Sequence, residues 1–268
     1  MSDAMTEQSF DDLADRYDLL VNWPRRLARE APFFKELFAR HKVQTVADVA
    51  CGTGHHAAMF HSWGLSVEGS DISPAMIEHC RRLHGEPEGL RWAQRAFSEL
   101  TVSPERFDAV ICLGNSLALA GGVADAASAV SAMISLCRPG GIVVVSLLNQ
   151  SAIEDNSILW QNVKRCRFEG RELLIVKALQ RLGERAAVDV LEIDLEHEPV
   201  TWRSRRWTMS RLERSDLERV FQSVDGVVEG VFGSYARDDF IPATSGDLII
   251  VWHNARPSTT PANREPGK

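Results

Sequence analysis

Strand-like and helix-like segments alternate through the middle of the chain, and this rhythm restricts the fold more than any other feature. The strand-like runs are Val43–Ala50, Leu65–Ser70, Leu90–Ala93, Phe107–Leu113 and Ile142–Asn149, and helical patterns at His55–Trp63, Pro74–Leu83 and Val123–Cys137 separate them. Five apolar strands with intervening helices within about 110 residues predict a doubly wound α/β sheet, because parallel strands need crossover connections. Ser73-Pro74 is a typical helix start.

The flanks follow other patterns. Phe10–Arg40 is helical in spacing, and Pro24 suits a first turn, so we expect two helices broken near Asn22-Trp23. After Asn149 the sequence favours strict alternation, which predicts antiparallel strands with one face exposed to water. These predicted strands are Leu173–Leu182, Ala186–Glu196 and Val200–Met209, and a helix at Arg214–Gln222 and strands at Val227–Phe232 and Asp247–Trp252 follow.

Composition excludes several classes of protein. The 268 residues carry a net charge of −7, which argues against a general basic surface for nucleic acid. The five cysteines are scattered without a CxxC pair, which favours buried free thiols over disulfides or a zinc site. The acidic N-terminus does not resemble a signal peptide, and no apolar stretch approaches the roughly 18 residues of a membrane span. We therefore expect a cytoplasmic protein that binds neither membrane nor nucleic acid.

A glycine turn follows the first strand, in the stretch TVADVACGTGHHA. Gly52-x-Gly54-x-x-Ala57 has the spacing of a dinucleotide fingerprint, and Asp71 lies 17 residues beyond Gly54, at the end of the second strand. A carboxylate there would accept hydrogen bonds from a ribose diol, both in NAD-binding proteins and in methyltransferases that use S-adenosylmethionine. Asp48 decides between the two, because a carboxylate would repel a pyrophosphate but attract the ammonium of a methionine.

Three motifs in order resemble those of class I S-adenosylmethionine-dependent methyltransferases. They are VADVACGTG, LGNSLAL at Leu113–Leu119 and LCRPGGIVVVS, with a final strand where that family reverses one. RYDLLVNWPRRLARE and the alternating insertion are similar to glycine and sarcosine N-methyltransferases. The resemblance implies a seven-stranded Rossmann-like sheet with N-terminal helices and an antiparallel lid after strand five.

The resemblance also divides the chain and assigns its cofactor, S-adenosylmethionine. It implies a helical cap (1–42), a cofactor-binding core (43–150 and 212–254), a lid insertion (151–211) and a disordered tail (255–268). The implied cofactor contacts are Tyr17, Trp23, one of Arg26 and Arg29, Asp48, Ala50, Gly52, Gly54, Asp71, Ile72, Met76, Ala96, Phe97, Leu113, Gly114 and Asn115. Ala96 and Phe97 stand where the family carries an acid, so we expect backbone, with Ser98 or Glu99, to hold the adenine amino group.

Four side chains are candidates for alignment or catalysis: Tyr17, His55, Asn115 and Tyr235. The alternatives are that His55 is a polar residue of a helix start, that Asn115 stabilises a strand-to-loop turn and that Tyr235 anchors a loop. Arg203 and Arg205 share one face of a predicted strand and could bind a substrate carboxylate; the alternative is a solvated face with arginine stems on tryptophan. Because His55 and His56 are adjacent and face different sides of the helix, we expect no metal site.

We therefore expect a methyltransferase that acts on a small molecule, on an amine nitrogen in the first instance. The alternatives are O- or C-methylation of a natural product, a catalytically inactive cofactor-binding protein, and an NAD oxidoreductase. Self-association is left open.

Overall fold

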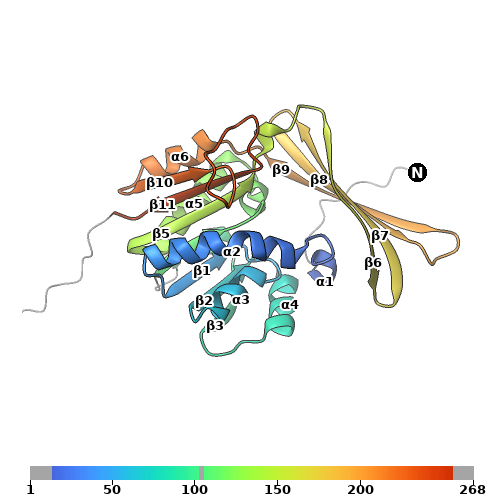
Figure 1. Cartoon of the computed structure of the whole chain (residues 1–268), viewed down its shortest axis with the longest axis horizontal. Coiled ribbons are helices and arrows are strands. Elements are labelled where there is room, and N and C mark those ends of the chain that lie inside the picture. Colours follow the sequence, from blue (N-terminus) through green and yellow to red (C-terminus); the bar gives the residue numbers. More distant parts are fainter. Residues whose placement is uncertain (1–13, 103–105, 256–268) are drawn as a thin grey trace, which may run out of the picture.

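A seven-stranded mixed sheet forms the centre of the structure, a computed structural model that describes residues 14–102 and 106–255 (Figure 1). Its strands are β1 (Thr45–Val49), β2 (Ser66–Asp71), β3 (Leu90–Gln94), β4 (Phe107–Cys112), β5 (Cys137–Leu148), β10 (Val227–Phe232) and β11 (Asp247–His253). The spatial order is β10-β11-β5-β4-β1-β2-β3, with β1 to β5 parallel and β11 antiparallel to both neighbours. The predicted doubly wound sheet and its reversed strand are confirmed.

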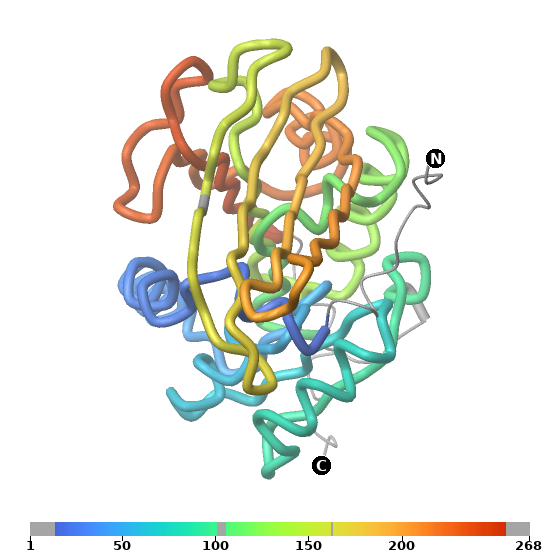
Figure 2. Tube along the Cα trace, turned by 90° about the vertical axis from the view of Figure 1, so that its right-hand side faces the viewer, coloured from blue at the N-terminus to red at the C-terminus, as the bar shows by residue number. Residues whose placement is uncertain are grey.

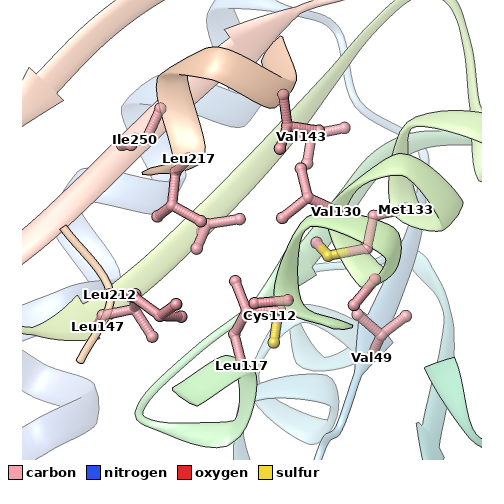
Figure 3. Close-up of a cluster of buried hydrophobic side chains, with 14 of the residues drawn as sticks. Val49, Cys112, Leu117, Val130, Met133, Val143, Leu147, Leu212, Leu217 and Ile250 are labelled. Carbon is pink, nitrogen blue, oxygen red and sulfur yellow. The ribbon is translucent and has the colours of Figure 1, made fainter. Parts of the chain in front are cut away.

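Helices cover both faces of this sheet, which explains why its strands read as continuous apolar runs. The covering helices are α2 (Trp23–Arg40), α3 (His55–Ser62) and α4 (Pro74–His84) on one face, and α5 (Val123–Leu136) and α6 (Arg214–Gln222) on the other. In β5, Ile142 and Val144 pack toward α2, whereas Val143 and Val145 pack toward α5. Figure 3 shows the cluster of buried side chains on the α5 and α6 side of the sheet, which includes Val130, Val143 and Leu217.

Local sequence sets the helix starts. Ser73 Oγ accepts a hydrogen bond from the Met76 amide at 3.1 Å, with Pro74 in the first turn of α4, as predicted. The short α1 (Ala14–Tyr17) ends before Asn22, whose side chain caps α2 by accepting from the Arg25 amide at 3.2 Å. The predicted break between two N-terminal helices is therefore confirmed. The 3₁₀ turns η2 (Phe97–Val102), η3 (Ser116–Leu119) and η4 (Gln150–Ala152) complete the connections.

A second sheet, which we call the lid sheet, crosses in front of the central one (Figure 2). Its antiparallel strands, in spatial order, are β6 (Ile158–Phe168), β7 (Arg171–Leu182), β8 (Arg185–Asp194) and β9 (Thr201–Ser210). Ile175, Val190 and Trp207 lie on its inner face and pack against Leu20, in the segment between α1 and α2. Sequence analysis missed β6, because ILWQNVKRCRF is exposed along most of its length and lacks a clean alternation.

The remaining predictions concern composition. All five cysteines are free thiols, four of them buried and Cys166 partly so. Among the described residues, none of the helices combines the length and apolarity needed to cross a membrane. The predicted disordered tail lies outside the described residues except for its first residue, Ala255, and the four-part division of the chain stays a prediction.

Candidate active site

A cavity of about 880 Å³ lies where the carboxyl ends of the parallel strands meet α1, the first turns of α2 and the lid sheet. Open α/β sheets bind ligands at this edge, beside the point where strand order reverses. Most of the predicted cofactor contacts line the cavity: Tyr17, Trp23, Arg26, Ala50, Gly52, Asp71, Ile72, Met76, Ala96, Phe97, Leu113, Gly114 and Asn115. The segments that carry them are far apart in sequence, so the fold itself brings them together.

The glycine turn after β1 approaches this cavity closely. Gly52 has a φ of +57°, and its amide donates to Asp71 Oδ2 at 2.9 Å. A Cβ built on Gly52 would lie 3.9 Å from Tyr17 Cε1, so the tyrosine ring covers the turn. Asp71 Oδ1 also accepts from the Ser73 amide at 3.0 Å. The carboxylate at the end of β2 is thus held in a fixed orientation at the cavity wall.

Asp48, in β1, is absent from the residues that line the cavity: it is buried directly behind the turn, and its Oδ2 has no hydrogen-bond partner among the described residues. Burial raises the pKa of Asp48 to about 7; Arg26 opposes the shift and Asp71 adds to it. A buried polar atom without a partner is costly, so Asp48 is a group that a cationic ligand would satisfy. The predicted attraction for an ammonium fits this position.

Arg26 is held beside Asp48 by a buried ion-pair network. Arg26 Nε donates to Glu30 Oε1 at 3.0 Å, and the same fully buried carboxylate bonds His56 Nε2 at 2.7 Å. Burial by itself would raise the pKa of Glu30, but its bonds to His56 and Arg26 outweigh this and lower it to about 2. Burial lowers the pKa of His56 despite Glu30. The network therefore fixes a guanidinium at the cavity wall.

Asp18 ties the segment between α1 and α2 to the glycine turn. Its carboxylate accepts from Trp23 Nε1 and Thr53 Oγ1, both at 2.7 Å, and bonds His55 Nε2 at 3.0 Å. Burial alone would raise the pKa of Asp18, but the bonds to His55, Thr53 and Trp23 lower it to about 2. The N-terminal segment is thus fastened over the cavity with Tyr17 and Trp23 in its wall.

Comparisons with known proteins agree with this geometry. Residues 46–141 match the family described as "Methyltransferase domain". A glycine/sarcosine N-methyltransferase of Parasynechococcus marenigrum is 31% identical over 150 residues, which are 55% of this chain and 53% of that protein. The glycine N-methyltransferase of Mus musculus is 33% identical over 141 residues, 48% of each chain. The chain spans about half the length of the curated relatives it matches.

Solved structures extend the likeness to the whole fold. A sugar N-methyltransferase from Streptoalloteichus has a TM-score of 0.74 at 21% identity, with 96% of this chain and 99% of that one covered. An amino pentose methyltransferase from Micromonospora echinaspora, solved with S-adenosylmethionine bound, has a TM-score of 0.68 at 22% identity, covering 95% and 100%. Residues 46–141 of this chain thus match a methyltransferase domain, and the chain as a whole has the fold of these solved methyltransferases.

The residues of the methyltransferase domain fit S-adenosylmethionine. The unpartnered Asp48 oxygen suits the ammonium of the methionine moiety, and Arg26 suits its carboxylate. A Cβ on Gly114 would lie 3.6 Å from Arg26 Nη2, so the guanidinium lies within van der Waals range of the turn after β4. Asp71 suits the ribose diol. The donor set is thus complementary to an amino-acid zwitterion joined to a nucleoside.

At the predicted adenine end of the domain, Ala96, Phe97 and Ser98 line the cavity. Glu99 is absent from the lining residues, and its Oε2 accepts from the Ala96 amide at 2.7 Å. Of the two candidates for the adenine amino group, Ser98 is therefore the one in the wall.

Three cofactor or catalytic predictions need correction. Gly54 does not line the cavity: a Cβ there would lie 2.6 Å from Trp92 Cη2, so this glycine is required by packing. Arg29 lies outside, with its side chain 56% exposed and paired with Glu30 and Asp247, which leaves Arg26 as the arginine of the wall. His55 also lies outside and stacks on Trp23 at 4.4 Å while bonding Asp18. His55 is therefore a polar residue at the start of α3, which was the alternative prediction for it.

Tyr235 and the two strand arginines are not at the cavity wall. Tyr235 is buried against Phe33 and Phe34, and its hydroxyl donates to Ser146 Oγ at 2.8 Å. Arg205 is buried and paired with Glu192, while Arg203 is exposed. Neither arginine is among the residues that line the cavity, so neither is placed to bind the carboxylate of a substrate there.

Asn115 has the structural role that was the alternative prediction, and it also lies at the cavity, where a contact with substrate stays a prediction. It lines the cavity, and its Oδ1 accepts from the Leu148 amide at 3.0 Å, which ties the end of β4 to the end of β5. The Leu148 bond uses one of the two lone pairs of Oδ1, so a contact with substrate would come from the other lone pair or from the Nδ2 amide.

The acceptor side of the cavity contains residues that sequence analysis missed. Val188, Val190, Trp207 and Met209 form an apolar wall from the lid sheet, and Lys177 of β7 is the one cationic side chain of that sheet that lines it among the described residues. A lone lysine inside the apolar run LLIVKAL was the available signal. His56 is also in the wall, but Glu30 occupies its Nε2.

Proposed function

We propose that this chain transfers a methyl group from S-adenosylmethionine to an amine nitrogen of a small molecule. The observation that carries the proposal is the buried, unpartnered Asp48 oxygen beside Arg26, at the turn that Tyr17 covers. A buried anion behind the turn and a cation in the wall suit the two charges of a methionine zwitterion. Asp71, the carboxylate that would bind the ribose, also lines the cavity.

The small-molecule part of the proposal is supported by the lid sheet. Its inner face closes the cavity with apolar side chains, and a volume of about 880 Å³ suits a cofactor together with a compact acceptor. The relatives are named for glycine and sarcosine, and two structural neighbours for sugar amines. Amino acids and amino sugars share an amine nitrogen, which is the acceptor class that we infer.

The residues of this chain contribute binding and alignment. S-adenosylmethionine supplies the methyl group as an electrophilic sulfonium carbon. Asp48 and Arg26 would hold the two charges of its methionine end, and Asp71 its ribose. Tyr17, Trp23 and the apolar lid residues would exclude water from the reacting atoms. Holding donor and acceptor in line can contribute roughly 7–11 kcal/mol in favourable cases, and an amine needs only its lone pair free.

A screen with methyl-labelled S-adenosylmethionine against glycine, sarcosine and D-glucosamine tests this proposal directly. We expect turnover with at least one amine, and an unchanged rate in the presence of a chelator, because an amine acceptor needs no Lewis acid. Transfer only to hydroxyl acceptors, or to none, would contradict the proposal.

Two variants test whether Tyr17 and Asn115 align the reacting groups. We expect Tyr17→Phe and Asn115→Ala to lower kcat more than cofactor affinity, because their side chains border the reacting region. Tyr235→Phe is the matched control, since its hydroxyl bonds Ser146 away from the cavity; kcat should stay unchanged. Equal losses in both tyrosine variants would show that stability, not alignment, is affected.

A further inference from the structure

Lys177 stands alone among apolar neighbours on the inner face of the lid sheet. Along β7 its neighbours on this face, Ile175 and Leu179, are both buried; Val190 lies directly opposite on β8, and the polar Asn162 is its register partner on β6. Lys177 itself is partly buried and lines the cavity. A lysine in such a position is unusual, because its ammonium loses hydration without an evident replacement.

Among the side chains that the structure describes, none forms a hydrogen bond or an ion pair with the Lys177 ammonium. The acidic residue nearest along this face of the sheet is Glu192, which is paired with Arg205 and with Arg16 at 3.3 Å. The charged and titratable groups that share the inner face of the lid sheet or the cavity with Lys177 include Arg16, Tyr17, Arg26, His56, Asp71, Asp125, Lys164, Cys166, Glu192, Arg203 and Arg205. Cations outnumber carboxylates in this set, and two of the carboxylates are engaged elsewhere: Glu192 with Arg16 and Arg205, and Asp71 with the Gly52 and Ser73 amides.

The apolar surroundings and the nearby positive charges both favour the neutral form of the Lys177 amine. Burial lowers the pKa of Lys177, and the Arg26 guanidinium lowers it further. A sulfonium in the same cavity would add a positive charge and act in the same direction. A neutral lysine amine offers a lone pair that accepts a proton, which is the property of lysines that serve as bases.

We propose that Lys177 is the general base that deprotonates the acceptor nitrogen. This inference rests on the proposed amine methylation. The acceptor enters as an ammonium ion, one of its N–H bonds breaks, and the proton moves to the Lys177 Nζ lone pair. The freed lone pair on the acceptor nitrogen is then available to attack the methyl carbon, and the Lys177 ammonium returns its proton to water after the product leaves.

Lysine NMR tests the protonation state without any acceptor. The chain has five lysines, Lys35, Lys42, Lys164, Lys177 and Lys268. Reductive methylation with ¹³C-formaldehyde labels each one, and Lys177→Met identifies its signal by absence. We expect Lys177 to titrate at lower pH than the other four, and lower still when S-adenosylmethionine is added. Titration together with the others would overturn the proposal.

The pH profile of kcat/KM tests the catalytic role, with the acceptor from glycine, sarcosine and D-glucosamine that wild type methylates best. We expect Lys177→Met to lose about 100-fold or more below the pKa of the free amine and to recover as pH rises above it. Lys177→Arg should be equally impaired, because a guanidinium does not give up its proton. The control is Lys164→Met, which removes another lid lysine, one that bonds the Leu19 carbonyl at 3.5 Å.

The outcomes separate this inference from the proposed function. Wild-type turnover of any of the three amines supports amine methylation whatever Lys177 does. A Lys177→Met profile parallel to wild type would overturn the base role. Full activity in Lys177→Arg would overturn it as well, because a permanent positive charge would then suffice, as in binding of an acceptor carboxylate.

Discussion

The two walls of the cavity are built in different ways. On the core side, the polar groups come from strand ends and turns, and almost every one is fixed by a neighbour: Gly52 N to Asp71, Ser73 N to Asp71, and Arg26 to Glu30. On the lid side, the wall is apolar and comes from three strands in register, with one lysine left without a partner among the described residues. The core wall is suited to a constant ligand, and the lid wall can change its acceptor by single substitutions.

The largest expected effect tests whether the glycine turn of the core wall is held by packing. Gly54→Val should destabilise the fold by about 2–5 kcal/mol, because its Cβ would lie 2.6 Å from Trp92 at a φ of +77°. Thermal or urea unfolding measures this loss. Gly64→Val is the control: Gly64 also has a positive φ, +86°, but no atom within 4 Å of a Cβ. Equal losses of stability in the two variants would mean that backbone strain at a positive φ accounts for the effect without the Trp92 contact.

The next effect concerns Asp71, the carboxylate that would bind the ribose. Asp71→Ala should weaken S-adenosylmethionine binding by roughly 1–3 kcal/mol, because it removes a charged acceptor and frees the Gly52 amide that it orients. Calorimetry measures the affinity, and circular dichroism verifies that the variant is folded. Wild type should bind NAD negligibly. An unchanged affinity for S-adenosylmethionine in a folded variant would remove Asp71 from the site.

Asp48 should make cofactor binding depend on pH. Its pKa of about 7 lies well above that of a free aspartate, so the carboxyl is protonated in acid, and only the anion pairs with an ammonium. Affinity should therefore be complete above pH 7 and fall by up to about tenfold per unit as pH decreases below it. Asp48→Asn should bind more weakly and show no such slope. A slope that persists in Asp48→Asn would assign the titration to another group.

The smallest effect probes the lid wall. Val188→Ala should leave S-adenosylmethionine affinity unchanged and raise the acceptor KM about fivefold, since losing the apolar contact of two methyl groups with the acceptor costs on the order of 1 kcal/mol. Leu191→Ala, on the opposite face of β8, is the control and should change neither constant. If Val188→Ala weakened cofactor binding instead, the core wall and the lid wall would not bind the cofactor and the acceptor separately, as we infer.

Sequence patterns predicted the core wall well because its chemistry is local. The Asp48-to-Gly54 turn and the Ser73-Pro74 helix start each place their groups within a few residues of chain, and a strand followed by a helix has few ways to fold. The errors arose where a role depended on distant neighbours. Gly54 packs on Trp92, and Tyr235 bonds Ser146, which lies 89 residues away.

By itself, the sequence determined the doubly wound sheet, its reversed last strand and the positions of Asp48, Gly52 and Asp71, because hydrophobic periodicity and turn chemistry are written in consecutive residues. Only the tertiary structure decided which of Arg26 and Arg29 lines the cavity and that Arg205 forms an ion pair with Glu192. It also decided that the Lys177 side chain has no ion pair within the described part of the chain. Those outcomes depend on strand register and on which charges meet across the fold, and a one-residue shift of register would turn Lys177 to the other face.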